Sequence, residues 1–292
     1  MASARSLSLM ALLLGCTQEQ EFIEIPIDAI AVSSGDYDHM EALLLRQLVN
    51  YQLYEGFIVG ATYDPDIDPD LMTLEVEGLL GSDDELENYG AVFVNSGTRG
   101  LGRWVYNGVD TDDALVSDAA VIKNVTDFVA GGGVLVASDW SYDLIEACWP
   151  GMITFVGDET VLDDAQRGQR GTVQALVHRE ALVNDLGQNV VSIDYDFSHW
   201  ATIASVSSDV EVILSGDVMY RVSELEGDIE LEDVPLLVAF DHGAGSVYFS
   251  TFHWHVQNPT VADTILFSVV EGLNPGGGED TDTGEGPADT GE

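Results

Sequence analysis

The chain has 292 residues, and 46% of them are apolar, which is enough to bury a substantial core. Its formal net charge is −43, because 52 acidic side chains outnumber nine basic ones. Contacts to phosphate dominate nucleic-acid affinity and require lysine and arginine, so this composition excludes nucleic acid as a partner. The acids are spread along the chain, which favours salt adaptation or solubility over collective binding of divalent cations.

Residues 1–15 are typical of an export signal peptide. Arg5 and the amino terminus supply positive charge, and Leu7–Leu14 forms a short apolar core. This core is too short to cross a bilayer as a permanent helix. A small residue, Gly15, then precedes Cys16, and a signal peptide would be cleaved between these two residues.

The stretch Leu13–Cys16 resembles the lipobox of bacterial lipoproteins, in which the cysteine is lipidated and becomes the first mature residue. The resemblance implies that lipidated Cys16 attaches the protein to a membrane and that residues 16–24 form a tether. Thr17 follows in place of the aspartate that retains lipoproteins in an inner membrane. We therefore expect an outer-membrane or cell-surface location in a bacterial envelope. The alternative is an ordinary signal peptide with an incidental cysteine.

A β-α-β unit is expected next. Ile25–Val32 is β-branched and apolar, as in a first strand, and Phe57–Ala61 is a candidate second strand. Between them, Asp38 and Glu41 have the spacing of a capping box for a helix that continues to Gln52. The two strands should be parallel, with a right-handed crossover.

An acidic loop follows, in which Asp64, Asp66, Asp68 and Glu75 have the spacing of an EF-hand calcium loop. Pro69, however, stands where that loop requires glycine. A Ca²⁺ site is one interpretation, and a solvated, proline-stiffened loop without any cofactor is the other.

The middle of the chain reads as further strands and helices of one sheet. Ala91–Asn95 predicts a strand, Val116–Ala130 a helix, and Val134–Ala137 a short buried strand. The last of these leads through Ser138–Ser141 into the amphipathic helix Tyr142–Cys148. Turn residues after a buried strand lie at the carboxyl edge of an open α/β sheet, where such sheets bind ligands. The same edge should hold the loop that begins at Ser96.

The second half is richer in β-structure and has no linker-like composition before it, so we expect it to extend or cover the sheet. A hairpin is predicted around Asp241–Gly245, and its second strand runs into His253. Asn258–Pro259 is a favourable start for a final helix ending at Gly272. Residues 274–292 contain six acids and no base or aromatic residue, which predicts a disordered tail. The short segments expected between them are strands at 152–156, 172–177, 190–193, 203–206, 210–214, 218–222 and 236–240, and a helix at 181–186.

The pieces GGGVLVASDW and GSVYFSTFHWH, in this order around the glycine hairpin, resemble the class I glutamine amidotransferase-like superfamily, and its trehalose-utilisation-type members in particular. The resemblance covers residues 25–273 as topology. It implies a flavodoxin-like three-layer α/β sandwich with a mainly parallel central sheet, here with the β-rich elaboration added.

In catalytic members of the superfamily, a cysteine occupies the elbow after the central strand, and a histidine and a glutamate follow the late hairpin. By position, the elbow falls at Ser138 or Asp139, the histidine is His253, and His255 takes the place of the glutamate. Cys148 lies about two helical turns past the elbow, where a buried structural thiol is expected. Thiol-dependent glutaminase chemistry is therefore not expected.

Three functions remain open. In the first, the domain binds a small molecule, glycan or protein without catalysis, using Asp139, Trp140, Ser141 and Ser96 together with Trp254 and His255. Aromatic residues near the elbow, namely Trp140, Trp149, Trp200 and Trp254, favour this interpretation.

In the second, Ser138 is the nucleophile of a hydrolase and His253 is its base. The third group that would orient this base is His255, Asp139 or Asp194. In the third function, His253, His255 and an aspartate bind a metal ion. All three depend on the elbow and the two histidines converging on one edge of the sheet.

Overall fold

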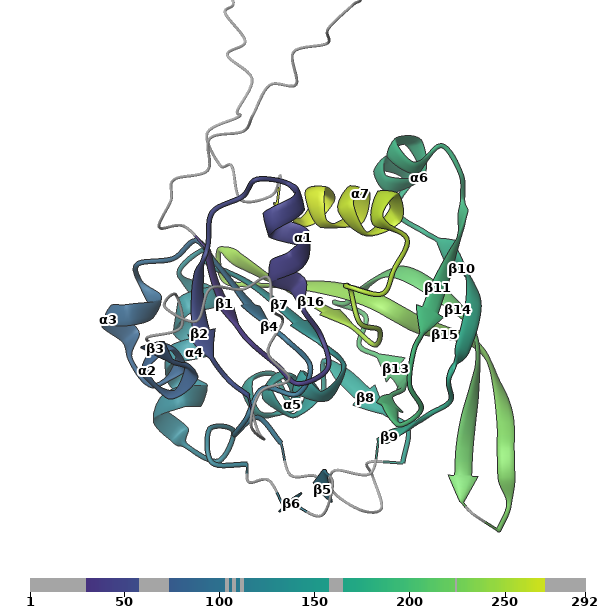
Figure 1. Ribbon diagram of the computed structural model, residues 1–292, viewed down its shortest axis with the longest axis horizontal. Coiled ribbons are helices and arrows are strands. Elements are labelled where there is room, and N and C mark those ends of the chain that lie inside the picture. The colour runs from purple at the N-terminus through teal and green to yellow at the C-terminus, as the bar shows by residue number, and fades with distance from the viewer. Residues whose placement is uncertain are drawn as a thin grey trace, which may run out of the picture.

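The structure is a computed structural model, which describes residues 30–57, 74–102, 105–106, 109–110, 113–157, 165–223 and 225–270. Most strands belong to one 12-stranded sheet. Ten of its strands follow the order β11-β10-β14-β15-β16-β7-β4-β1-β2-β3, and the other two, β9 and β12, branch from this path where β9 pairs with β14 (Figure 1). The strands are β1 (Ile30–Ser33), β2 (Gln52–Glu55), β3 (Leu74–Glu75), β4 (Ala91–Val94), β5 (Val105–Tyr106), β6 (Val109–Asp110), β7 (Val134–Ser138), β8 (Ile153–Phe155), β9 (Gln166–Gly168), β10 (Gly171–Val177), β11 (Val190–Tyr195), β12 (Trp200–Ala201), β13 (Ile203–Val206), β14 (Glu211–Ser223), β15 (Gly227–His242) and β16 (Gly245–Ser250).

The helices lie between these strands. They are α1 (Met40–Arg46), α2 (Val76–Leu80), α3 (Asp83–Leu86), α4 (Ala119–Ala130), α5 (Tyr142–Cys148), α6 (Glu180–Leu186) and α7 (Pro259–Val270), and a single 3-10 turn, η2 (Asp139–Ser141), precedes α5. The mixed α/β class predicted from the sequence is confirmed. The short helices α2 and α3 were not predicted.

The half of the sheet that contains the central strand is parallel. β2, β1, β4, β7 and β16 are neighbours in this order, and each adjacent pair is parallel. Counted along the chain, these five strands have the order 2-1-3-4-5, which is the order of flavodoxin-like doubly wound sheets. The two-residue strand β3 adds a further parallel strand beside β2 at the edge of the sheet. The order reverses between β1 and β4, and this is the position at which such sheets bind ligands.

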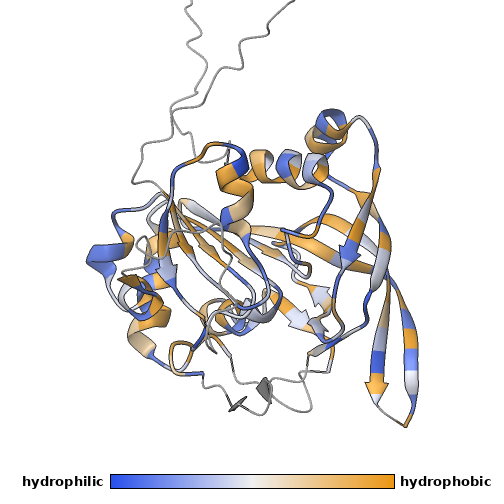
Figure 2. Ribbon diagram, in the orientation of Figure 1, coloured by the Kyte–Doolittle hydropathy of each residue, from blue (hydrophilic) through white to orange (hydrophobic). Residues whose placement is uncertain are grey.

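Side chains of the parallel strands alternate between two buried clusters, one on each face of the sheet. Val134 and Val136 pack with residues of α1 and α7, whereas Leu135 and Ala137 pack with residues of α4 and α5. Burial on both faces explains why the central strands are almost continuously apolar. Figure 2 shows this as hydrophobic colouring of the central strands, in contrast to the hydrophilic α3.

The antiparallel half extends the sheet beyond β16, as the sequence predicted. β16 is antiparallel to β15, and β15 is antiparallel to β14. The two segments expected at 210–214 and 218–222 form the single long strand β14, whose pairing with β15 has irregularities near Gly216. The distal parts of β14 and β15 project from the body as an arm (Figure 1).

The length predicted for the first helix is wrong. Helix α1 ends at Arg46, not at Gln52, and Leu48 then adopts a left-handed conformation with φ of 58°. The strand that follows α1 is Gln52–Glu55. Of the predicted strand Phe57–Ala61, Phe57 is described and is not in a strand, and the other residues lie outside the described ones. The parallel pairing of the strand after α1 with β1 is confirmed.

The capping box predicted from Asp38 and Glu41 is also not formed, because other groups use both carboxylates. The N-cap of α1 is His39, without a side-chain cap hydrogen bond. Asn95 instead accepts a hydrogen bond from the backbone N–H of Met40 at 2.9 Å. By contrast, Asn258 caps α7 as expected and accepts from the backbone N–H of Thr260 at 3.0 Å.

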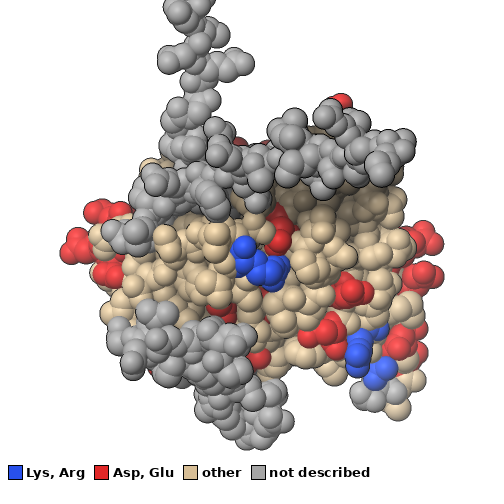
Figure 3. Space-filling view, turned by 45° about the horizontal axis from the view of Figure 1, so that its top comes forward, with Lys and Arg blue, Asp and Glu red and all other residues tan. Residues whose placement is uncertain are grey.

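Charge on the surface is unevenly distributed. On the face shown in Figure 3, acidic side chains gather mainly toward the margins, and basic side chains gather at two places beside acidic ones. Among the described residues, no helix is long and apolar enough to cross a membrane.

Candidate functional site

A buried polar cluster lies where the parallel strands end. Ser33 ends β1, Asn95 follows β4, Ser138 ends β7, and His253 lies three residues after the end of β16. All four side chains are buried. Because the strands are parallel, their carboxyl ends meet at one edge, and residues distant in sequence come together there.

The elbow after β7 has a strained backbone at Asp139. This residue has φ of 43°, in the left-handed region that non-glycine residues seldom adopt. Its carboxylate is buried and fully engaged. Oδ1 accepts a hydrogen bond from the Ala201 N–H at 2.7 Å, and Oδ2 accepts from the Ser96 hydroxyl at 3.3 Å. The strained conformation thus directs a carboxylate into the interior of the sheet edge.

His253 contacts this carboxylate and a second one. Its Nε2 lies 3.1 Å from Oδ2 of Asp139, and its Nδ1 lies 2.9 Å from Oδ1 of Asp196. Since both ring nitrogens face carboxylate oxygens, the arrangement fits a doubly protonated imidazolium that donates to both. The elbow and the histidine segment therefore meet, as the topology of the sheet edge required.

The electrostatics of the cluster also favour the imidazolium. Burial disfavours the charged ring of His253, but its hydrogen bonds to Asp139 and Asp196 outweigh this effect and raise its pKa to about 10. Burial raises the pKa of Asp139, against the hydrogen bonds that it accepts. Because three donors converge on the Asp139 carboxylate, we place the proton of this pair on His253.

Asp38 holds the same segment from the other side. Its buried carboxylate accepts from the backbone N–H of Trp254 at 3.0 Å and from that of His255 at 3.2 Å, and it lies 3.1 Å from Nδ1 of His255. Burial alone would raise the pKa of Asp38, but the His255 hydrogen bond and the positive charges of His253 and His255 outweigh it and lower the pKa to about 2. Asp38 therefore anchors the turn that carries both histidines.

A chain of six rings, called the ring cluster below, lies over the buried charges. Successive ring centroids are 4.6 Å apart for Trp140 and Tyr37, 5.4 Å for Tyr37 and Phe197, and 5.1 Å for Phe197 and His253. The chain continues at 6.1 Å to His255 and at 5.0 Å from His255 to His39. Phe197 is 42% exposed, and Trp140, His255 and His39 are half-buried. The cluster thus reaches solvent through aromatic and imidazole rings.

The other residues predicted for the site lie in the interior. Ser138 accepts from the backbone N–H of Ser96 at 3.0 Å, and Ser141 donates to the carbonyl of Asn95 at 3.1 Å. Trp254 is completely buried in the core. Of the six predicted binding residues, Trp140 and His255 are therefore the two that reach the surface.

Two further tryptophans are buried and do not reach the surface near the elbow. Trp149, at the end of α5, packs against Phe240 in the core. Trp200 stacks on Tyr195 with a centroid separation of 4.1 Å, and both rings are buried.

Within the described residues, the hydrogen bond that a Ser138 hydrolase needs is not formed. Both nitrogens of His253 are engaged by Asp139 and Asp196, and the Ser138 hydroxyl bonds to the Ser96 backbone. The group at Nδ1 is Asp196, while Asp194 accepts from the Thr172 hydroxyl at 2.6 Å. No group of three or more histidine, cysteine or acidic side chains in the described part of the chain is arranged to hold a metal ion.

The remaining predicted positions lie elsewhere or outside the described residues. Cys148 is buried on α5, and burial raises the pKa of its thiol to about 12, as suits a structural thiol. Glu75 is exposed and pairs with Arg99 at 3.4 Å. Cys16, with the signal peptide and tether, the aspartates Asp64, Asp66 and Asp68, and the tail at 274–292 are all outside the described residues.

Sequence reasoning missed Asp38, Asp196 and Phe197. Asp196 and Phe197 follow β11, which lies in the antiparallel half, so no strand-order argument placed them beside His253. The sequence could have indicated Asp38 as a site residue, since it follows the first strand at the same edge of the sheet as the elbow. Its spacing to Glu41 favoured local capping instead.

Comparisons with known proteins return structural likenesses alone. No family model matches the chain, and no curated relative matches it. A ThuA-like protein from Bacteroides uniformis aligns with a TM-score of 0.49 and 10% identity, over 87% of this chain and 94% of that one.

Two more solved structures are similar at the same level. The structure described as the mmIFT52 N-terminal domain aligns with a TM-score of 0.49 and 14% identity, over 85% of this chain and 98% of that one. A protein described as a subunit of GMP synthase, from Thermoplasma acidophilum, aligns with a TM-score of 0.47 and 12% identity, over 84% and 94% of the two chains. At these scores the likenesses assign neither a family nor an activity.

Proposed function

We propose that this protein is a lipid-anchored binding protein of the bacterial cell envelope, whose flavodoxin-like three-layer domain is amidotransferase-like in topology but not catalytic. The observation that carries the proposal is that carboxylates contact both ring nitrogens of His253. An imidazole held by carboxylates at both nitrogens, with a raised pKa, is not available as a general base near neutral pH.

The amidotransferase-like assignment rests on the order of the parallel strands and on the elbow. The order of the five strands from β2 to β16 is that of flavodoxin-like sheets, and by the sequence resemblance Asp139 and His253 correspond to the superfamily's catalytic cysteine and histidine. The nucleophilic thiol, however, is replaced by a carboxylate with three donors. We therefore interpret the contact between Asp139 and His253 as a structural ion pair and not as a nucleophile with its base.

The ring cluster is the proposed ligand surface. It lies at the carboxyl edge of the parallel strands, and its members that reach the surface, Trp140, Phe197 and His255, provide flat apolar rings. Asp196 is partly exposed beside them and adds an acceptor. Such a surface suits a glycan or a peptide, in which apolar faces alternate with hydroxyl or amide groups.

The anchoring part of the proposal rests on the lipobox-like stretch that ends at Cys16. Lipidation there would attach the domain through the residues up to Ile30. Thr17 favours the outer membrane or the cell surface over the inner membrane.

A labelling experiment separates the binding domain from the serine hydrolase, its competing interpretation. The full chain is incubated with a fluorophosphonate probe, and ammonia release from glutamine is assayed in parallel. We expect neither adduct nor ammonia. An adduct on Ser138 that disappears in His253→Gln would establish the hydrolase and overturn the proposal.

Binding is tested by saturation-transfer NMR with maltotriose as the glycan probe and a tryptophan-containing tripeptide as the peptide probe. We expect transfer to one of them, with loss in Phe197→Ala and Trp140→Ala. Leu225→Ala is the matched control, since Leu225 is 98% exposed on the arm. Absence of transfer to both probes, or equal transfer in all variants, would refute the ring cluster as the binding surface.

A further inference from the structure

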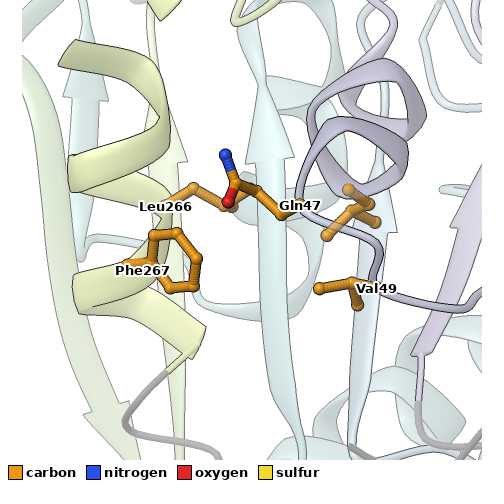
Figure 4. A pocket seen from close by; sticks show the side chains of 5 residues that line it. Gln47, Val49, Leu266 and Phe267 are labelled. Atoms are coloured by element: carbon orange, nitrogen blue, oxygen red, sulfur yellow. The ribbon is translucent and has the colours of Figure 1, made fainter. Parts of the chain in front are cut away.

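An apolar surface lies where α1 ends beside α7, and we call it the α1–α7 patch. Leu45 and Leu48 are 54% and 68% exposed, although most large apolar side chains of the described chain are buried. Next to them a pocket is lined by Leu44, Gln47, Val49, Leu266 and Phe267. Figure 4 shows that Gln47 and Val49, at the end of α1, face Leu266 and Phe267 of α7.

The patch lies at the edge of the sheet opposite the ring cluster. α1 begins just beyond the carboxyl end of β1 and runs back toward the amino end of the parallel strands. Val49 precedes Gln52, and Gln52 is paired with Ala31 near the start of β1. The patch therefore borders the point at which the chain from Cys16 enters the domain at Ile30.

Its composition differs from that of the rest of the chain. Residues 42–51 and 264–270 contain no acidic residue, although 52 of the 292 residues are acidic. Arg46 in this region is paired with Asp263 at 2.8 Å. A surface without acidic side chains can approach lipid without removing carboxylates from water, and exposed leucines gain free energy when they leave water.

We propose that the α1–α7 patch rests on a neutral lipid surface when the protein is anchored, so that the ring cluster faces away from the membrane. The inference rests on the proposed lipidation of Cys16. Ile30 comes 14 positions after Cys16 in the chain. Such a tether spans at most about 50 Å, which keeps the adjoining patch within reach of the bilayer.

Photocrosslinking of the full chain tests the contact. The protein is produced in a host that lipidates lipoproteins, with the photocrosslinker benzoylphenylalanine in place of Leu48, and is reconstituted into phosphatidylcholine vesicles. The matched control carries the crosslinker in place of Leu225 on the arm. After irradiation, lipid adducts are quantified by mass spectrometry. We expect at least tenfold more lipid adduct at position 48 than at position 225.

Flotation with the vesicles separates failure of the patch from failure of the anchor. If the wild type floats and Cys16→Ser does not, anchoring stands, and equal lipid adducts at the two positions would overturn the patch. Crosslinks from position 48 to protein, without lipid, would also overturn it and would identify a second copy or another protein as the occupant. If the wild type does not float, both the anchor and the inference fail.

Discussion

The carboxylate of Asp139 lies 3.1 Å from Nε2 of His253, and Asp139 reaches this position with a left-handed backbone. The pair joins the elbow after β7 to the segment after β16, which are 114 residues apart in the chain. Because both side chains are buried, their ionisation is coupled to folding.

The first prediction concerns alkaline pH. The folded pKa of His253, about 10, is above the ordinary value of 6.5, so protonated His253 stabilises the fold. This contribution is fully present below pH 6.5 and is lost as the pH rises through about 10. We expect the free energy of unfolding in urea to fall by several kcal/mol over this range, and His253→Gln to flatten the decrease. His199→Asn, at an exposed histidine, is the control and should leave the decrease unchanged.

The second prediction distinguishes the contribution of the Asp139 backbone conformation to stability from that of the Asp139 charge. Asp139→Ala leaves His253 with one carboxylate and should cost about 3–5 kcal/mol in urea denaturation. Asp139→Asn should cost less, because asparagine tolerates the left-handed conformation and still accepts from the Ala201 N–H. Both variants should lower the pKa of His253 in an NMR titration. An unchanged pKa would contradict the assignment of the shared proton.

Acid pH tests Asp38. Its folded pKa, about 2, is below the ordinary value of 3.8, so ionised Asp38 stabilises the fold above pH 3.8, and this stability is lost as the pH falls toward 2. Asp38→Asn should therefore reduce the free energy of unfolding at neutral pH and weaken its dependence on pH between 4 and 2. Circular dichroism at graded pH measures both effects. The exposed Asp209→Asn should behave like the wild type.

Two glycines in different hairpins should respond unequally to substitution: Gly243 lies between β15 and β16, and Gly227 lies between β14 and β15. Gly243 has φ of 64°, and a Cβ there would lie 2.5 Å from the carbonyl oxygen of Ala130. Gly227 has φ of 79°, but a Cβ there meets nothing within 4 Å. Gly227→Ala should cost about 1–2 kcal/mol from backbone strain alone, and Gly243→Ala at least twice as much. Equal losses of stability in the two variants would argue against close packing at the turn that contains Gly243.

The charge of −43 predicts that added salt stabilises the fold. Repulsion among carboxylates weakens as the Debye length shortens, so the melting temperature should rise between 0.01 M and 1 M sodium chloride. Calcium chloride at matched ionic strength distinguishes screening from specific binding. A calcium effect that exceeds screening and disappears in Asp64→Asn/Asp66→Asn would favour the calcium loop, whereas a flat response to sodium chloride would contradict screening.

The elements that sequence patterns predicted well are those with a local cause. The buried strands β4 and β7 and the helix α5 follow directly from apolar runs and helical spacing, and Asn258–Pro259 marks the start of α7. The first helix was predicted too long, since α1 ends at Arg46 and Leu48 then adopts a left-handed conformation. That conformation depends on tertiary packing, since leucine has no intrinsic preference for it.

The location of the candidate site could be predicted from the sequence better than the chemical role of its residues. The parallel sheet required the Ser138–Asp139 elbow and His253 to share an edge, and they do. Asp196 and Asp38 decide what His253 can do, yet each is one acid among 52 in the sequence. Long-range contacts of this kind carry no local pattern.

Strand β16 has a consequence for the order in which the molecule can assemble. It is the strand that joins the parallel half, through β7, to the antiparallel half, through β15. It is the last strand of the described chain. During synthesis from the amino terminus, the sheet therefore cannot close until residues Gly245–Ser250 have left the ribosome. Until then β7 and β15 each present an unpaired edge, and a chain truncated before β16 would have two exposed templates for aggregation in place of one continuous sheet.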